Sequence, residues 1–326
     1  MLTEIPQVRR DNAGFGEIVY RAFRDIGFVF VYAPEVTEKL PRIFSKFKEV
    51  FGLPAEIKQK YNGEEVHYQR GWLPPDTEEA IACRHIGPGR TSVANAYEGW
   101  FMGPDLPPDH SMVLRSPKLN APNIWPDEVP EFHLAMADLY MSLRPIGMEV
   151  LKAVAPRIGK DPDYFDEITR DGTTVMRALH YPAIKPEQVG KVMWGCRHTD
   201  ICLLTMLPSG SRQGLYIKLK GKSVWISGMA PAGYVVAQVG DMFQHLTGGE
   251  FTSAWHEVRA PKEPTSEGRY SAAMFIHPRS DVVLGFDESE SPDKAKRYPK
   301  RTADDLLQTR LNEIGLGEGK KKKSAY

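Results

Sequence analysis

Residues 198–207 read HTDICLLTML, and this short segment decides both the fold and the site that we expect. Residues 201–207 are an apolar run rich in strand-forming residues, and residues 234–239 (YVVAQV) are another. On a strand, side chains two positions apart point to the same face. If His198 and Asp200 lie in extended chain, both side chains can therefore reach one metal ion.

A second histidine, His256, follows Asp200 after 55 intervening residues, and we expect it on a strand that returns past the first segment. Two imidazoles and one carboxylate can occupy one face of a six-coordinate metal ion and leave the opposite positions open. That ligand set is typical of non-haem Fe(II) sites that use O2. Thirteen residues beyond His256, Arg269 and Ser271 provide a guanidinium and a hydroxyl that suit a carboxylate. The sequence therefore predicts an iron site, formed by His198, Asp200 and His256, with a binding site for an acidic co-substrate beside it.

Five further segments carry a family resemblance, and their order and spacing together are specific. They are similar to segments of the isopenicillin N synthase-like family of Fe(II)/2-oxoglutarate-dependent dioxygenases, and the resemblance covers about residues 5–284. The segments are residues 22–31 (AFRDIGFVFV), like the opening helix and first strand; 70–74 (RGWLP), with tryptophan for the usual tyrosine; 123–126 (NIWP), like the turn before a long helix; 177–182 (RALHYP), like the RLNYYP strand; and 240–244 (GDMFQ), like the GD turn.

The chain departs from this family at two places. Leu179 stands where the family has asparagine and His180 where it has the first tyrosine, so one polar contact near the co-substrate is missing or rebuilt. The gap between His256 and Arg269 is a few residues longer than usual, which predicts a longer loop between the last two strands. Neither departure removes a predicted metal ligand.

The resemblance implies an Fe(II)/2-oxoglutarate-dependent oxygenase. 2-Oxoglutarate would occupy two open positions on the iron and O2 the third. Arg269 would pair with the distal carboxylate through two parallel hydrogen bonds, a geometry that lysine cannot match, and Ser271 and Tyr181 would add contacts. A small-molecule substrate would be hydroxylated, desaturated or cyclised while succinate and CO2 are released.

The substrate pocket is predicted from polar and aromatic residues near the expected mouth of the barrel. Arginine side chains would bind a carboxylate on the substrate, and tryptophans would stack on an aromatic ring. The candidates are Arg70, Trp72, Arg84, Trp194, His245, Trp255 and His277.

Two other functions fit the same motif. An oxidase of the isopenicillin N synthase type keeps the arginine and serine but uses them on the carboxylate of its substrate, without 2-oxoglutarate. A catalytically silent iron- or ligand-binding module is the third possibility, although binding alone does not require three open metal positions.

The remaining patterns predict the organisation of the chain. Helical spacing covers residues 15–24, 36–50 and 130–155, a short strand covers residues 28–32, and closely spaced strands begin at residue 173. We expect a mainly β fold with flanking helices, built on a double-stranded β-helix core (jelly roll, cupin-like) with an N-terminal α/β region. The expected parts are residues 1–122, a helix and strand region that packs on the barrel; residues 123–286, the long helix and the core with the metal site; and residues 287–326, a C-terminal helix (303–314) and a polar, basic tail.

Composition limits the partners. Lysine plus arginine equal aspartate plus glutamate, at 42 each, so no net field favours nucleic acid. No apolar run is long enough for a membrane span, and the N-terminus lacks a secretory signal. Three cysteines argue against a disulfide framework, and Cys196 and Cys202 are interpreted as small buried apolar residues. We therefore expect a cytoplasmic protein, monomeric or weakly dimeric, that binds a small molecule and neither nucleic acid nor membrane.

Overall fold

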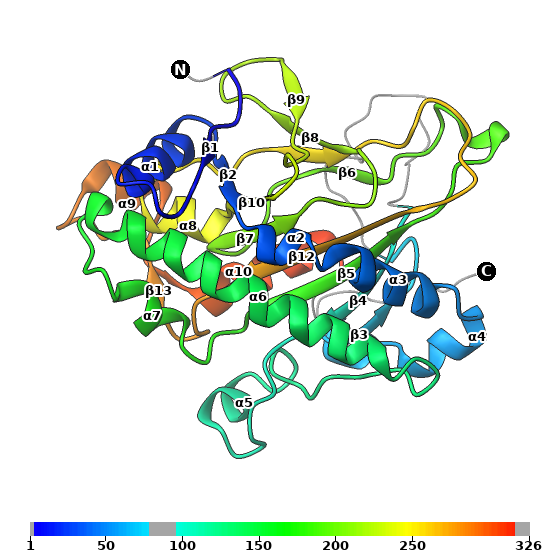
Figure 1. Cartoon of the computed structure of the whole chain (residues 1–326). Coiled ribbons are helices and arrows are strands. Elements are labelled where there is room, and N and C mark those ends of the chain that lie inside the picture. The colour runs from blue at the N-terminus through cyan, green and yellow to red at the C-terminus, as the bar shows by residue number, and fades with distance from the viewer. Residues whose placement is uncertain (1–2, 78–95, 317–326) are drawn as a thin grey trace, which may run out of the picture.

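A computed structural model describes residues 3–77 and 96–316, and its main element is one large sheet (Figure 1). Neighbouring strands are antiparallel except the first pair. Their order across the sheet is β1 (Gln7–Val8), β2 (Phe28–Tyr32), β10 (Tyr234–Val239), β7 (Leu204–Pro208), β12 (Arg269–Ile276), β5 (Val175–Tyr181), β4 (Glu98–Met102) and β3 (Gly71–Leu73).

A smaller antiparallel sheet completes the core. Its order is β6 (Gly195–His198), β11 (His256–Val258), β8 (Leu215–Lys218) and β9 (Trp225–Ser227). A third sheet pairs β13 (Val283–Leu284) with β14 (Arg301–Thr302). Side chains from the large sheet and the smaller four-stranded sheet line one cavity, so the predicted mainly β core is confirmed.

Helices cover the opposite face of the large sheet, and Figure 1 shows α6 running across it with α1 and α3 on the same side. Strands such as β7 and β10 are therefore buried on both faces, which explains their continuous apolar runs. The helices are α1 (Phe15–Asp25), α2 (Pro34–Thr37), α3 (Leu40–Phe51), α4 (Ala55–Lys58), α5 (Ser111–Arg115), α6 (Glu131–Val154), α7 (Tyr164–Thr169), α8 (Asp241–Leu246), α9 (Pro292–Arg297) and α10 (Ala303–Ile314).

Close packing of α6 on the sheet depends on Gly147. A Cβ atom at this position would clash with Cδ1 of Ile276 in β12. Glycine therefore lets the helix backbone approach the sheet. The remaining apolar face of α6 is buried, including Leu139, Leu143 and Val150. The predicted long helix over residues 130–155 is thus confirmed.

Two sequence predictions need correction, and two others are not tested by the structure. The predicted helix over residues 36–50 is two helices. Pro41 lies in the first turn of α3, where a backbone N–H would have no acceptor within the helix, so proline is tolerated there. The predicted strand over residues 201–207 begins only at Leu204, because residues 201–203 connect the two sheets. Arg84 lies outside the described residues. The division into parts at residues 122 and 286 stays a prediction, and β3 and β4 from the first part share the large sheet with β5.

Candidate metal centre

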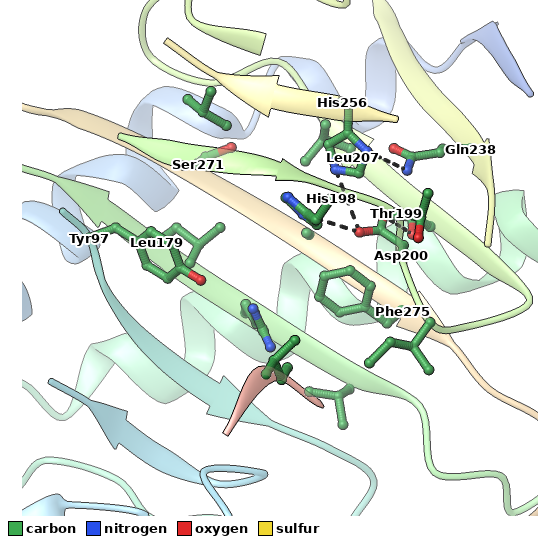
Figure 2. Close-up of a pocket in the computed structure, with 18 of the residues that line it drawn as sticks. Tyr97, Leu179, His198, Thr199, Asp200, Leu207, Gln238, His256, Ser271 and Phe275 are labelled. Atoms are coloured by element: carbon green, nitrogen blue, oxygen red, sulfur yellow. Dashed lines mark hydrogen bonds and ion pairs between the residues drawn. The ribbon is translucent and has the colours of Figure 1, made fainter. Parts of the chain in front are cut away.

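His198, Asp200 and His256 come together at one end of the small sheet (Figure 2). His198 ends β6, His256 begins β11, and the two residues are register partners in the antiparallel pair. Asp200 lies two residues beyond β6 in the connection to β7, so the two motif residues do not share one strand, which was the condition on which the sequence brought them together. One potential ligand atom from each residue lies within 4.8 Å of the others.

Hydrogen bonds orient these side chains so that their potential ligand atoms lie close together. Nδ1–H of His198 donates to the carbonyl oxygen of Cys196 at 2.7 Å, which leaves the lone pair of Nε2 free. Nε2 of His198 lies 3.6 Å from Oδ1 of Asp200, and Nε2 of His256 lies 3.5 Å from the same oxygen. The other oxygen of Asp200 accepts a hydrogen bond from Thr205 Oγ1 at 2.6 Å. Two imidazole nitrogens and one carboxylate oxygen therefore converge.

His256 is oriented by groups that contact its Nδ1 atom, on the side of the ring away from Nε2. Nδ1 of His256 lies 3.3 Å from the carbonyl oxygen of Ala254 and 3.1 Å from the side-chain amide of Gln238 in β10. In the tautomer that leaves Nε2 free for a metal ion, Nδ1–H donates, and the Gln238 amide meets it through its oxygen. Burial, with a smaller contribution from the nearby His198, lowers the pKa of His256 to about 4. His256 is therefore neutral near pH 7, the form that binds a metal ion. His256 and Asp200 are buried, whereas the His198 side chain is 46% exposed.

A candidate co-substrate holder lies in the same cavity. Arg269 begins β12, is buried, and donates from Nε to the carbonyl oxygen of Arg212 at 3.0 Å. Its guanidinium carbon lies 4.9 Å from the ring centroid of Tyr181, its register partner in β5. Burial lowers the pKa of Arg269. Within residues 3–77 and 96–316, its Nη1 is buried and has no hydrogen-bond partner, so the guanidinium has an unused donor.

The backbone around Arg269 leaves space for that guanidinium. A Cβ atom at Gly210 would lie 2.5 Å from Nη2 of Arg269, so a side chain at residue 210 would displace it. Ser271 follows two residues along β12, on the same face, and also lines the cavity. An unused buried donor beside a hydroxyl fits a carboxylate group.

The cavity has a volume of about 160 Å³ and joins the two groups of residues. It is lined by the three convergent residues and by Arg269, Ser271 and Tyr181. It can therefore hold a metal ion at one end and a carboxylate at the other.

Two family models match the chain. Residues 172–278 match the 2OG-Fe(II) oxygenase superfamily, and residues 5–128 match the N-terminal region described as non-haem dioxygenase in morphine synthesis. A crystal structure of a 2OG-Fe(II) oxygenase family protein from Caulobacter crescentus is 30% identical, with a TM-score of 0.78 over 96% of this chain and 100% of that one. The chain belongs to the 2OG-Fe(II) oxygenase superfamily.

Other relatives support the same family assignment. The 2-oxoglutarate-dependent dioxygenase traH of Penicillium crustosum is 28% identical over 85% of this chain and 82% of its own length. The clavatol oxidase claD of the same organism is 27% identical over 90% and 89%. A full-length Neurospora crassa protein, solved in complex with alpha-KG, is 22% identical, with a TM-score of 0.76 over 94% and 95% of the two chains, and shows the shared fold.

These comparisons confirm the predicted jelly-roll fold, the enzyme class and the cofactors. The protein is an Fe(II)/2-oxoglutarate-dependent oxygenase that uses O2. Of the three functions that the sequence left open, the 2-oxoglutarate-dependent one is therefore the function of this chain.

The substrate pocket that the sequence predicts stays a prediction, and the cavity beside the candidate metal ligands has a different lining. Six of its seven candidates lie among the described residues, and none of the six lines the cavity of this oxygenase. Trp72 and Trp194 are buried, and each indole N–H donates within the core, to Oε2 of Glu98 at 2.8 Å and to the carbonyl oxygen of Pro182 at 3.0 Å. The two rings therefore fill the core with their polar atoms satisfied.

The other four candidates also lie elsewhere. Arg70 is fully buried and donates to the adjacent backbone carbonyl. His245 contacts the carbonyl oxygen of Pro299 at 2.7 Å, and Trp255 is 46% exposed. His277 is buried, and its Nδ1 contacts a carbonyl oxygen two residues before it. The sequence shows these residue types but does not show which face of the fold they occupy.

Sequence reasoning missed several residues that do line the cavity. Four come from α10, where apolar residues four apart, such as Leu307 and Leu311, form one helix face. That spacing predicts an amphipathic helix but not the surface that it covers. The missed lining residues include Tyr97, Phe101, Arg177, Gln238, Phe275, Leu307, Arg310, Leu311 and Ile314.

The two cysteines beside the metal motif differ. Cys202 is free and fully buried, and burial raises the pKa of its thiol well above the usual range, as expected for a small buried residue. Cys196 is also buried, as expected, but it is disulfide-bonded, which contradicts the expectation that the three cysteines argue against disulfides. Separately, no helix within the described ranges is both long and apolar enough to cross a bilayer.

Proposed function

We propose that His198, Asp200 and His256 hold Fe(II) and that Arg269, Ser271 and Tyr181 hold 2-oxoglutarate beside it. The observation that carries this proposal is the convergence of both Nε2 atoms on one oxygen of Asp200, in the same cavity as the unused donor of Arg269. Fe(II), with 2-oxoglutarate and O2 bound, supplies the oxidising chemistry and yields succinate and CO2.

The protein residues bind and orient the metal ion and 2-oxoglutarate, and they exclude water from the site. Gln238 and the backbone fix the His256 ring, and Thr205 fixes the Asp200 carboxylate, so each ligand atom is presented without reorganisation. Arg269 binds the distal carboxylate of 2-oxoglutarate and thereby fixes how far the other end of the molecule extends toward the metal. Because Arg269 is buried, water does not compete for that pairing.

The substrate occupies the rest of the cavity in this proposal. That part is lined largely by apolar side chains from β4, β12 and α10, among them Phe101, Phe275 and Leu307. Arg177 adds a charged group, with its guanidinium carbon 4.3 Å from the ring centroid of Phe101. A small, largely apolar molecule with a polar group fits this lining. The cytoplasmic location and the monomeric or weakly dimeric state stay predictions.

Calorimetric titration with 2-oxoglutarate tests the two-part site. Mn(II) replaces Fe(II), because it accepts similar ligands but does not turn over. We expect 2-oxoglutarate to bind the Mn(II)-loaded protein at least ten times more tightly than the metal-free protein, because the metal and Arg269 hold opposite ends of one molecule. Equal affinity with and without metal would contradict the proposal, since the two ends would then not be coupled.

A further inference from the structure

Arg177 lies in the part of the cavity that the proposed metal and co-substrate sites leave to the substrate. It is half-buried in the middle of β5 and lines the cavity. Its guanidinium carbon lies 4.3 Å from the ring centroid of Phe101 in β4 and 5.2 Å from that of Phe275 in β12. Contacts with aromatic rings hold a guanidinium in place without neutralising its charge. Arg177 therefore brings a positioned positive charge to the cavity wall.

The strand register separates Arg177 from the proposed 2-oxoglutarate contact of Arg269. Arg269 pairs with Tyr181, whereas Arg177 pairs with Ala273, four residues further along β12. Four residues of strand span about 13 Å. The two carboxylate carbons of 2-oxoglutarate, joined through four single bonds, are at most about 6 Å apart. The contact with Phe275, a further two residues from Arg269, places the Arg177 guanidinium on the side away from Arg269. The carboxylate bound by Arg269 is therefore out of reach of Arg177.

The ring of Phe275, which Arg177 contacts, lies beside the candidate metal ligands. Phe275 pairs with Thr205, whose hydroxyl donates to Asp200 at 2.6 Å. Figure 2 shows the Phe275 ring close to Asp200, at the opposite side of the view from Tyr97. A molecule that binds Arg177 is therefore close to the metal ligands, and a substrate must lie there to be oxidised.

The charges along the cavity wall favour an anion at Arg177. Among the described residues that line the cavity, the acidic ones are limited to Asp200, which belongs to the proposed metal site. Three arginines line it: Arg269, assigned to 2-oxoglutarate, Arg310 and Arg177. Arg310 forms an ion pair with Asp241 at 3.3 Å. The substrate part of the wall is therefore positively charged at Arg177, and this charge favours a negatively charged group over a neutral or positive one.

We propose that Arg177 binds a carboxylate of the substrate, and that the substrate is a small carboxylic acid with an apolar body. This inference rests on the proposed iron and 2-oxoglutarate site. A guanidinium offers two parallel N–H donors, which match the two oxygens of a carboxylate. A phosphate group has three terminal oxygens and nearly twice the charge, so it needs more donors than one arginine supplies. Phe101, Phe275 and Leu307 line the cavity and contact the apolar body.

Calorimetric titration with matched acids and amides tests this role. The probes are phenylacetate, 3-phenylpropanoate and 4-phenylbutanoate, each compared with its primary amide, because the amide keeps the shape and removes the charge. The protein carries Mn(II) and saturating 2-oxoglutarate, so that Arg269 is occupied. We expect at least one acid to bind the parent protein about ten- to a hundredfold more tightly than its amide, as for hydrogen bonds to a charged group. In Arg177→Met this preference should disappear.

Two further variants sharpen the test. Arg177→Lys keeps the charge but loses the pair of parallel donors, so it should keep only part of the preference for the acid. Arg259→Met removes an arginine that also lies over two rings, those of Tyr216 and Trp225, but that does not line the cavity. It should keep the full preference. Methionine is unbranched and fills the space between the two rings at residue 177, so Arg177→Met should bind 2-oxoglutarate as the parent protein does.

Three results would overturn the inference. The first is a parent protein with no preference for any of the acids, and the second is an unchanged preference in Arg177→Met. The third is weaker 2-oxoglutarate binding in Arg177→Met, which would assign Arg177 to the co-substrate instead. A parent protein that binds no 2-oxoglutarate in the presence of Mn(II) would contradict the proposed function itself, whereas a missing acid preference alone contradicts only the role of Arg177.

Discussion

His198 and His256 face each other across the β6–β11 pair, with ring centroids 4.2 Å apart. Each ring presents Nε2 to the same oxygen of Asp200, although His198 is half exposed and His256 is buried. Strand register therefore brings together two residues that are far apart in the sequence. The metal site needs only one more residue, from the connection that leaves β6.

Removal of a predicted ligand should abolish iron binding without unfolding the protein. His198→Ala is the clearest case, because its side chain is 46% exposed and its loss leaves little unfilled space. We expect Fe(II) affinity to fall at least a hundredfold, measured by equilibrium dialysis, with an unchanged circular dichroism spectrum. His133→Ala, at an exposed histidine on α6, is the matched control. Full iron stoichiometry in His198→Ala would refute the ligand assignment.

Arg269→Lys should weaken 2-oxoglutarate binding while iron binding remains. Lysine keeps the charge but loses the planar pair of donors and the contact with the Tyr181 ring. We expect the dissociation constant for 2-oxoglutarate to rise about ten- to a hundredfold in Mn(II)-loaded protein. Arg259→Lys, at an arginine that pairs with Glu257, should leave it unchanged. Equal effects of the two substitutions would argue against a specific role for Arg269.

Gly210→Ala should have an effect similar to that of Arg269→Lys without altering any charge. The added methyl group would lie 2.5 Å from Nη2 of Arg269, so the guanidinium must move. Gly159→Ala is the control: a methyl group there meets no atom of the described part of the chain within 4 Å, although its φ of +71° costs about 1 kcal/mol of stability. We expect only the first variant to lose 2-oxoglutarate affinity in calorimetry, even if both lose stability.

Gln238→Leu should lower iron affinity about ten- to a hundredfold, the usual effect of losing a residue that orients a ligand. Leucine is similar in size and keeps the buried site filled, but it cannot hold Nδ1 of His256. A competition assay with a metal-sensing dye measures the change. Gln308→Leu on α10 provides the control, because among the described residues that amide donates to Asp304 alone. Parent-like iron affinity in Gln238→Leu would show that the backbone contact alone orients His256.

His277 should make the stability of the protein depend on pH. Burial lowers its pKa from 6.5 to about 4 in the folded state. As pH falls below 6.5, the unfolded state therefore binds a proton that the folded state does not. The free energy of unfolding should fall by roughly 3 kcal/mol between pH 6.5 and 4 from this residue alone. Urea denaturation of the parent and of His277→Asn checks this, and an identical pH dependence in the two proteins would contradict it.

The candidate metal site could be predicted from the sequence because its residue types are chemically specific and two of them, His198 and Asp200, are only two positions apart. Strand alternation brings His198 and Asp200 to one face only if both lie in extended chain, whereas β6 ends at His198. The two side chains still converge, because Asp200 lies only two residues beyond the strand and its carboxylate is fixed by Thr205. The motif was therefore informative even though the local structure was different.

The substrate side was not predictable, because it depends on which face each element presents. Trp72 and Trp194 have the residue type of a stacking platform, but their N–H groups find partners in the core and the rings are used for packing. Conversely, Leu307 and Leu311 look like ordinary residues of an amphipathic helix, yet α10 covers the cavity with them. Only the fold brings this C-terminal helix to the metal site.

The central claim is that one cavity binds Fe(II) through His198, Asp200 and His256 and binds 2-oxoglutarate through Arg269. Its most direct test is anaerobic titration of the Fe(II)-loaded parent protein with 2-oxoglutarate, followed by visible absorption. We predict a weak charge-transfer band that saturates at one equivalent of 2-oxoglutarate per iron and is absent in His198→Ala. An iron-loaded protein that shows no band at saturating 2-oxoglutarate would contradict the claim.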